Sequence, residues 1–216
     1  MRLITILKFL LIFIVPCLLF LLVLNFAGFD SSFYKEKSSE YGVQQSVPEA
    51  ISLHEKVIDF IKGKENDLPA DFNEREQQHL WDVRSLVRIS TIALYALIFL
   101  FVLSLVISAV ILKVNNYITN FVGKVLIFGG FLTVVMAIIL FFLISLDFTA
   151  SFDSFHQLFF EKGTYTFDPA KEIITKIYPE QFFMDAGASI SKNVVIASIA
   201  VVLIGLLLIF SSKRKK

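Results

Sequence analysis

Residues 89–112 read ISTIALYALIFLFVLSLVISAVIL, a run of 24 residues without a charge. A helix of roughly 20 residues crosses the hydrocarbon core of a bilayer, which is about 30 Å thick. Three further largely apolar runs occur at 1–26, 125–146 and 193–210. Backbone groups in lipid must find hydrogen-bond partners within their own segment, which favours helices. We therefore predict an all-α integral membrane protein with four transmembrane helices.

The four runs divide the chain into spans, two long inserts and short basic connections. The predicted order is span 1–26, insert 27–88, span 89–112, connection 113–124, span 125–146, insert 147–192, span 193–210 and tail 211–216. The first run is longer than the apolar core of a typical secretory signal, and Asn25-Phe26-Ala27 matches a cleavage site poorly. We expect this run to be an uncleaved anchor. The single cysteine, Cys17, has no partner for an internal disulfide.

Charge is segregated along the chain. The first run, the connection 113–124 and the tail carry basic residues and no acidic ones, whereas all 19 acidic residues lie in the two inserts. Lysine and arginine near span ends favour the cytoplasmic side. We therefore predict that both termini are cytoplasmic and that the inserts form an extracellular cap. The inserts are net acidic, which argues against nucleic acid as a partner.

Local patterns in the first insert predict two helix starts. Ser46 followed by Glu49, and Asn73 followed by Glu76, each have the spacing of a capping box. Between them Ala50, Leu53, Val57 and Ile61 share one helical face, and Gly63 is a suitable stop. After Glu74 no residue interrupts a helix before Leu112, so one long helix should begin outside the membrane and cross it.

Three histidines lie on the predicted outer side. His79 precedes the second span by about ten residues and His156 follows the third span by about ten, so the two should approach one interface at similar height. His54 borders an apolar helix face, where a partly buried or capping role is the simpler interpretation. Histidine exchanges protons near neutral pH because its unperturbed pKa is about 6.5. His79 and His156 are therefore candidates for acid–base work, with packing or metal binding as alternatives.

The second insert is rich in aromatic residues. Ten of them occur between Phe148 and Phe183, and His156 stands among them in FDSFHQLFF, residues 152–160. Such residues are common in belts at the membrane interface. A lipid-contacting pocket is the competing interpretation, with Phe155, Phe159 and Phe160 as its candidates. The chain has no G-x-S-x-G elbow, no H-E-x-x-H motif and no glycine-rich phosphate loop, so those enzyme classes are not indicated.

Two segments resemble the bacterial lipoprotein intramolecular transacylase family. They are FNEREQQHLWDVRSL, residues 72–86, and FDSFHQLFFEKGTYTFDPAKEIITKIYPEQFFMD, residues 152–185. The order of spans is also similar. The chain departs from the family pattern at Leu80, Arg84 and Tyr165, none of which is a histidine. The resemblance implies that the sn-2 acyl chain of a diacylglyceryl lipoprotein moves to the α-amino group of its own N-terminal cysteine, giving a lyso-form lipoprotein.

The resemblance also implies a site and a setting. His79 and His156 would be the catalytic pair, with no cofactor and no metal, in a multi-pass protein of the bacterial cell membrane. Its partners would be the lipid bilayer and the substrate lipoproteins. Asp82 and Asp153 are candidates to orient the two rings, and Tyr34 and Tyr165 are candidate oxyanion donors. A non-enzymatic membrane scaffold and a metal-dependent membrane hydrolase remain the alternative functions.

Overall fold

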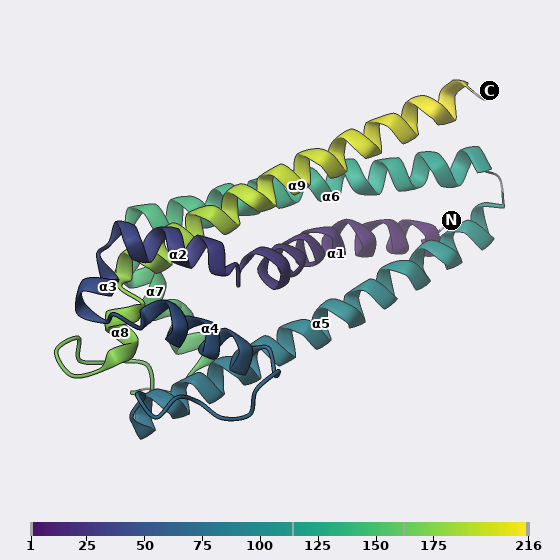
Figure 1. Ribbon diagram of the computed structural model, residues 1–216. Coiled ribbons are helices and arrows are strands. Elements are labelled where there is room, and N and C mark those ends of the chain that lie inside the picture. Colours follow the sequence, from purple (N-terminus) through teal and green to yellow (C-terminus); the bar gives the residue numbers. More distant parts are fainter. Residues whose placement is uncertain (1, 114, 162, 215–216) are drawn as a thin grey trace. The chain divides into compact units, whose positions relative to one another are not determined.

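The computed structural model describes residues 2–113, 115–161 and 163–214, and within these ranges all regular structure is helical (Figure 1). The helices are α1 (Arg2–Ala27), α2 (Ser31–Glu40), α3 (Val43–Ser46), α4 (Ala50–Ile61), α5 (Glu74–Leu112), α6 (Asn115–Leu146), α7 (Phe148–Phe159), α8 (Ile173–Ile177) and α9 (Glu180–Arg214). Among the described residues, α1, α5, α6 and α9 are long and apolar enough to cross a membrane. The all-α prediction with four spans is confirmed.

The first compact unit consists of residues 1–25, 92–142 and 189–216, and it contains most of each long apolar stretch. Here α6 and α9 run antiparallel and touch at glycines. A Cβ atom placed on Gly123 would lie 2.8 Å from the Gly205 carbonyl oxygen, and one placed on Gly205 would lie 2.8 Å from the Gly123 oxygen. Small residues allow such close backbone contact, which is how helices gain packing energy in lipid.

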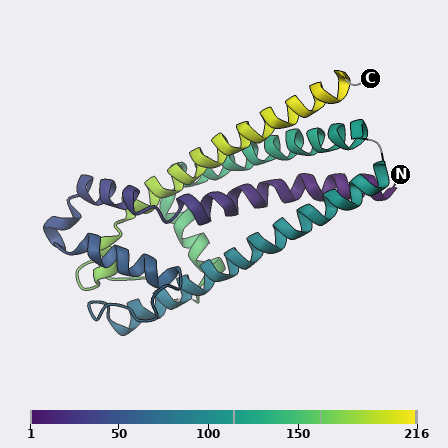
Figure 2. The ribbon, with the colours of Figure 1, turned by 45° about the vertical axis from the view of Figure 1, so that its right-hand side comes forward.

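The basic ends of the apolar helices lie together within this first unit. The Lys8 ammonium of α1 lies 5.6 Å from the ring centre of Phe128 in α6, and Gly123 of α6 meets Ile209 of α9. Figures 1 and 2 show the start of α1, the end of α5 and the end of α9 at the same end of the unit. That arrangement is required if these ends share one side of the membrane. Which side they face stays a prediction from charge.

The second compact unit consists of residues 26–91 and 143–188. It has its own core, formed by α3, α4, α8 and the first part of α5. Its most deeply buried members are Ala50, Leu53, Val57, Phe60, Phe72, Leu80 and Ile177. The predicted apolar face of 50–61 is therefore confirmed, and burying such side chains contributes roughly 1.5–3 kcal/mol each. His79 and His156 both belong to this unit.

Two of the predicted helix ends are confirmed. The Asn73 side chain accepts a hydrogen bond from the Glu76 N–H at 3.0 Å, and Glu76 accepts one from the Asn73 N–H at 2.8 Å, so α5 begins with a capping box. Helix α4 ends with Gly63 at φ +75°, where the Gly63 and Lys64 N–H groups donate to the carbonyls of Phe60 and Asp59. This is a Schellman ending, and it needs a residue that tolerates positive φ.

The predicted capping box at Ser46 is wrong. Ser46 is the last residue of α3, and α4 begins at Ala50 without a side-chain cap. Val43 and Val47 are both buried in the core of the second unit. The chain turns between α3 and α4 so that both valines can reach this core. Burial of the valines outweighs the roughly 1 kcal/mol that a serine cap contributes.

Two helices extend beyond the apolar runs that predicted them. Helix α6 begins at Asn115, so most of the expected connection 113–124 is helical, and Phe121 and Val125 continue one buried face through it. Helix α9 covers residues from the expected insert and from the expected tail, since it runs from Glu180, directly after Pro179, to Arg214. Hydropathy marks the part of a helix that suits lipid, whereas its ends depend on caps and packing.

Candidate active site

His79 lies in the second turn of α5, in the polar part of the helix before the uncharged stretch that starts at Ile89. Its side chain is buried, and its Nδ1 atom has no hydrogen-bond partner among the described residues. Three rings surround it. Their centres lie 6.1 Å away for His156, 5.0 Å for Phe160 and 5.4 Å for Phe167. His79 and His156, which were expected at similar height, therefore lie side by side.

His156 lies near the end of α7, which begins with a cap in which Asp147 accepts a hydrogen bond from the Ala150 N–H at 2.9 Å. Its Nδ1 atom is 2.8 Å from the Phe152 carbonyl oxygen, one turn earlier. A carbonyl can only accept, so Nδ1 carries the proton and donates it. In the neutral ring this leaves the Nε2 lone pair free to accept a proton.

Burial keeps both rings neutral at neutral pH. Desolvation, assisted by the nearby His156, lowers the pKa of His79 to about 4. Desolvation also lowers the pKa of His156, but the Phe152 carbonyl and the Asp153 carboxylate act in the opposite direction because they favour the charged ring. Two groups near His156 thus favour its charged form, and no such group acts on His79.

The aromatic candidates divide into two groups. Phe160 lies against both histidines, since its ring centre is 5.0 Å from His79 and 5.3 Å from His156, and Tyr165 is 4.9 Å from His156. Phe155 also contacts His156, at 5.4 Å, but about half of its side chain is exposed, as is that of Phe159. The site therefore has an inner ring cluster and an outer apolar face on α7.

The predicted supporting residues are placed unevenly. The Asp82 carboxylate accepts a hydrogen bond from Gln78 at 3.2 Å and makes none with His79, so it does not orient that ring directly. Asp153 is exposed and acts on His156 only through its charge.

Tyr34, the other candidate oxyanion donor, lies in a ring cluster with His54, and no contact joins it to His79 or His156 among the described residues. Its hydroxyl donates to the Ile177 carbonyl at 3.0 Å, and its ring stacks on His54 at 3.8 Å. His54 is buried, and its Nδ1 atom lies 3.0 Å from the Tyr178 hydroxyl. Burial lowers the pKa of His54 to about 4 and raises the pKa of both tyrosines. This cluster joins α2, α4 and the chain after α8, and it supports the structural interpretation of His54.

Two contacts of the histidine pair were not predicted. The Phe152 ring lies 3.9 Å from His156, and Phe167 lies against His79. The sequence held a signal for Phe152, which precedes His156 by one helical turn and so shares its face. No local signal marks Phe167, because only the path of the loop between α7 and α8 brings it to α5.

No three histidine, cysteine, aspartate or glutamate side chains in the described ranges form a group that could hold a metal ion. The chemistry that the arrangement offers is proton transfer and hydrogen bonding by two neutral imidazoles in an aromatic surround.

Comparison with known proteins found a matching family model and matching solved structures. The family model of the lipoprotein intramolecular transacylase Lit matches residues 5–183. No curated protein matches the chain. The membrane-integral lipoprotein intramolecular transacylase Lit from Bacillus cereus superposes with a TM-score of 0.80 at 24% identity, covering 100% of this chain and 98% of that one.

Two variants of the same Bacillus cereus protein also match. One has a histidine changed to arginine and gives a TM-score of 0.82 at 21% identity, covering 100% of this chain and 96% of that one. The other has a histidine changed to alanine and gives a TM-score of 0.81 at 22% identity, covering 100% of this chain and 97% of that one. Identities this low show the common fold, while the family model matches most of the sequence. The chain belongs to the lipoprotein intramolecular transacylase family, Lit, and is a membrane enzyme of that family.

Proposed function

We propose that this protein moves the sn-2 acyl chain of a diacylglyceryl lipoprotein to the α-amino group of the lipoprotein's N-terminal cysteine. The observation that carries the proposal is the meeting of His79 and His156, whose ring centres lie 6.1 Å apart inside an aromatic cluster. Two neutral imidazoles suit acyl transfer when the substrate brings its own nucleophile. The amine is that nucleophile, so no serine or cysteine of the enzyme is required.

The reaction needs one proton to move. The amine nitrogen attacks the ester carbonyl, the new N–C bond forms, and the C–O bond to glycerol breaks. The proton lost by the amine nitrogen ends on the glycerol oxygen, so the product is an isomer of the substrate. One base that returns the proton it takes is sufficient.

His156 suits this shuttle. Its Nδ1–H is held by the Phe152 carbonyl, which fixes the ring and leaves Nε2 as acceptor. The same carbonyl and the Asp153 charge favour the imidazolium that forms when Nε2 takes the amine proton. We assign His156 as the base that accepts this proton and then delivers it to the glycerol oxygen.

His79 suits a different task. A proton on its buried, unpartnered Nδ1 would leave a buried donor unsatisfied, which favours the tautomer with the proton on Nε2. We assign this Nε2–H as a hydrogen-bond donor to the oxyanion of the tetrahedral intermediate, with the Tyr165 hydroxyl as a second donor. Removing one such donor typically costs roughly 10²–10³-fold in rate.

The aromatic residues would hold the substrate and limit water. Ester and amine belong to one molecule, so their orientation dominates the rate. Phe160 covers the histidine pair, and exclusion of water there protects the ester from hydrolysis. The exposed faces of Phe155 and Phe159 would meet the acyl chains. We place the site on the outer side of the bacterial cell membrane, with 27–88 and 147–192 as its cap, because the basic segments favour the inside.

Tandem mass spectrometry of lipopeptides from cells with and without the protein tests the proposal. The fragments locate the acyl chain, which is necessary because substrate and product have equal mass. We expect an N-acyl cysteine with a lyso-glycerol only when the protein is present. A metal-dependent hydrolase would release fatty acid and respond to a chelator, and a scaffold would leave the acylation pattern unchanged; either result would overturn the proposal.

A further inference from the structure

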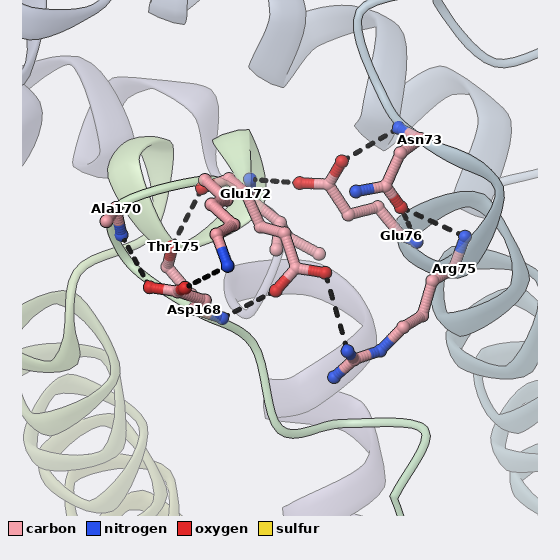
Figure 3. Close-up of polar contacts among 9 residues, drawn as sticks. Asn73, Arg75, Glu76, Asp168, Ala170, Glu172 and Thr175 are labelled. Atoms are coloured by element: carbon pink, nitrogen blue, oxygen red, sulfur yellow. Dashed lines mark hydrogen bonds and ion pairs between the residues drawn. The ribbon is translucent and has the colours of Figure 1, made fainter.

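Glu76 is a buried carboxylate three residues before His79, with 1% of its surface exposed. One carboxylate oxygen, Oε2, accepts the Asn73 N–H at 2.8 Å, as a capping box requires. The other, Oε1, accepts the Ile174 N–H at 2.8 Å (Figure 3). That second bond joins the first turn of α5 to the first turn of α8, 98 residues along the chain. Glu76 therefore does more than cap its own helix.

Glu172 makes a second connection beside the first. Its side chain is also buried, and its Oε2 atom accepts a hydrogen bond from the Asp168 N–H. Its Oε1 atom lies 3.7 Å from a guanidinium nitrogen of Arg75, the residue before Glu76 (Figure 3). Glu172 thus fixes the backbone at Asp168 and ties it to α5. We call Arg75, Glu76 and Glu172 the carboxylate network.

The network ends at the proposed active site through Phe167. The Arg75 guanidinium lies 5.1 Å from the centre of the Phe167 ring, in a cation–π contact. The same ring meets the His79 ring at 5.4 Å and at an interplanar angle of 69°. Phe167 is adjacent to Asp168, whose N–H the network holds, so its backbone and its ring are both fixed from α5.

We infer that Arg75, Glu76 and Glu172 are positioning residues that hold Phe167 over the ring of His79. The inference rests on the proposed function, because it assigns the network to a site in which His79 acts. None of the three residues touches the reacting atoms. They act through the Phe167 ring, which keeps His79 in one orientation and shields it from water.

Loosening the network should change the proton affinity of His79. The rings packed against His79 come from His156, Phe160 and Phe167, and His156 is the titratable group among them. On α5 itself Arg75, Glu76 and Asp82 lie within one turn of it. Desolvation is the main cause of the low pKa of His79. Water entering beside a displaced Phe167 would raise this pKa toward 6.5. If the network only stabilised the fold elsewhere, its loss would leave the pKa of His79 unchanged.

The chain has three histidines, which makes this measurable by NMR. The folded protein with ¹³C-labelled histidine in detergent is titrated, and each resonance is assigned by replacing one histidine at a time. In Arg75→Ala and Phe167→Leu we expect the pKa of His79 to rise by about one unit or more and acyl transfer to fall about tenfold. The pKa of His54 should not change, which makes it an internal control. Arg75→Lys should restore part of both effects.

Glu76→Gln should give the same two changes as Arg75→Ala. Glu40→Gln is its matched control, since Glu40 is an exposed carboxylate of the same unit, paired with Lys37 at 2.8 Å, and does not act on the pKa of His54. If Glu76→Gln does not fold, Arg75→Ala tests the inference in its place, because the Arg75 side chain is half exposed and its loss leaves no cavity. An unchanged His79 pKa in folded Arg75→Ala and Phe167→Leu would overturn the inference. Full activity of His79→Ala would overturn the proposed function instead, and the titration would still report on the network.

Discussion

At the scale of single residues, two buried histidines whose pKa values are both lowered have different surroundings. Burial lowers the pKa of both His54 and His79 to about 4. His54 has a tyrosine hydroxyl on Nδ1 and a stacked tyrosine, as a packed core histidine does. His79 has a second histidine beside it and an unpartnered Nδ1. A lowered pKa therefore marks burial, and the neighbours distinguish the structural role of His54 from the catalytic role that we propose for His79.

Stability should fall in mild acid because of these groups. A folded pKa of about 4 against 6.5 unfolded means that the unfolded chain binds more protons between these values. The free energy of unfolding should be unaffected above pH 6.5, fall as the pH drops through that window, and level off below about 4. The loss at pH 5 should be about 2 kcal/mol per histidine.

His54→Phe separates the two contributions. This substitution keeps a ring against Tyr34 but leaves the Tyr178 hydroxyl without its partner. The free energy of unfolding at pH 7 should therefore fall by about 1–3 kcal/mol. The fall in thermal unfolding midpoint between pH 7.5 and 5 should be smaller than that of the parent, because only His79 and His156 still contribute to it, and acyl transfer should be retained. An unchanged pH dependence would show that His54 is not the buried neutral group described above.

At the scale of elements, the apolar helices pack where glycine permits backbone contact. Gly205→Ala would place a methyl group 2.8 Å from the Gly123 carbonyl oxygen, which cannot move without shifting α6. Overpacking of this kind costs about 1–3 kcal/mol, so the unfolding midpoint should fall. Gly187→Ala on the same helix is the control, because its methyl group would meet only the flexible end of Ile144. Equal midpoints for the two variants would refute the close α6–α9 crossing.

The elements also show how far the sequence could predict the structure. Apolar runs predicted four apolar helices, and Asn73 with Glu76 predicted the start of α5, because these signals lie within one segment. Signals of this local kind do not predict contacts between distant segments. Tyr34 and Tyr165 were equal candidates, yet only Tyr165 contacts His156. The second partner of Glu76 is Ile174, 98 residues away, which no local pattern indicates.

At the scale of the whole molecule, the charge pattern predicts which ends face the cytoplasm. Single cysteines in a Cys17→Ala background test this with a membrane-impermeant thiol reagent. Asp67→Cys and Ser211→Cys suit the test because both positions are exposed. We expect labelling of intact cells at position 67 and not at 211. The reverse pattern would place the histidine pair in the cytoplasm and contradict the proposed location.

The central claim is that His79 and His156 act together on one acyl transfer. The direct test incubates purified protein with a synthetic diacylglyceryl lipopeptide and measures N-acyl product per folded molecule by tandem mass spectrometry. We expect His79→Ala and His156→Ala each to lower the rate roughly 10²-fold or more, with His54→Phe close to the parent. The double variant should be scarcely slower than the slower single one, because residues that act as a unit are not additive. A parental rate in folded protein lacking either His79 or His156 would contradict the account.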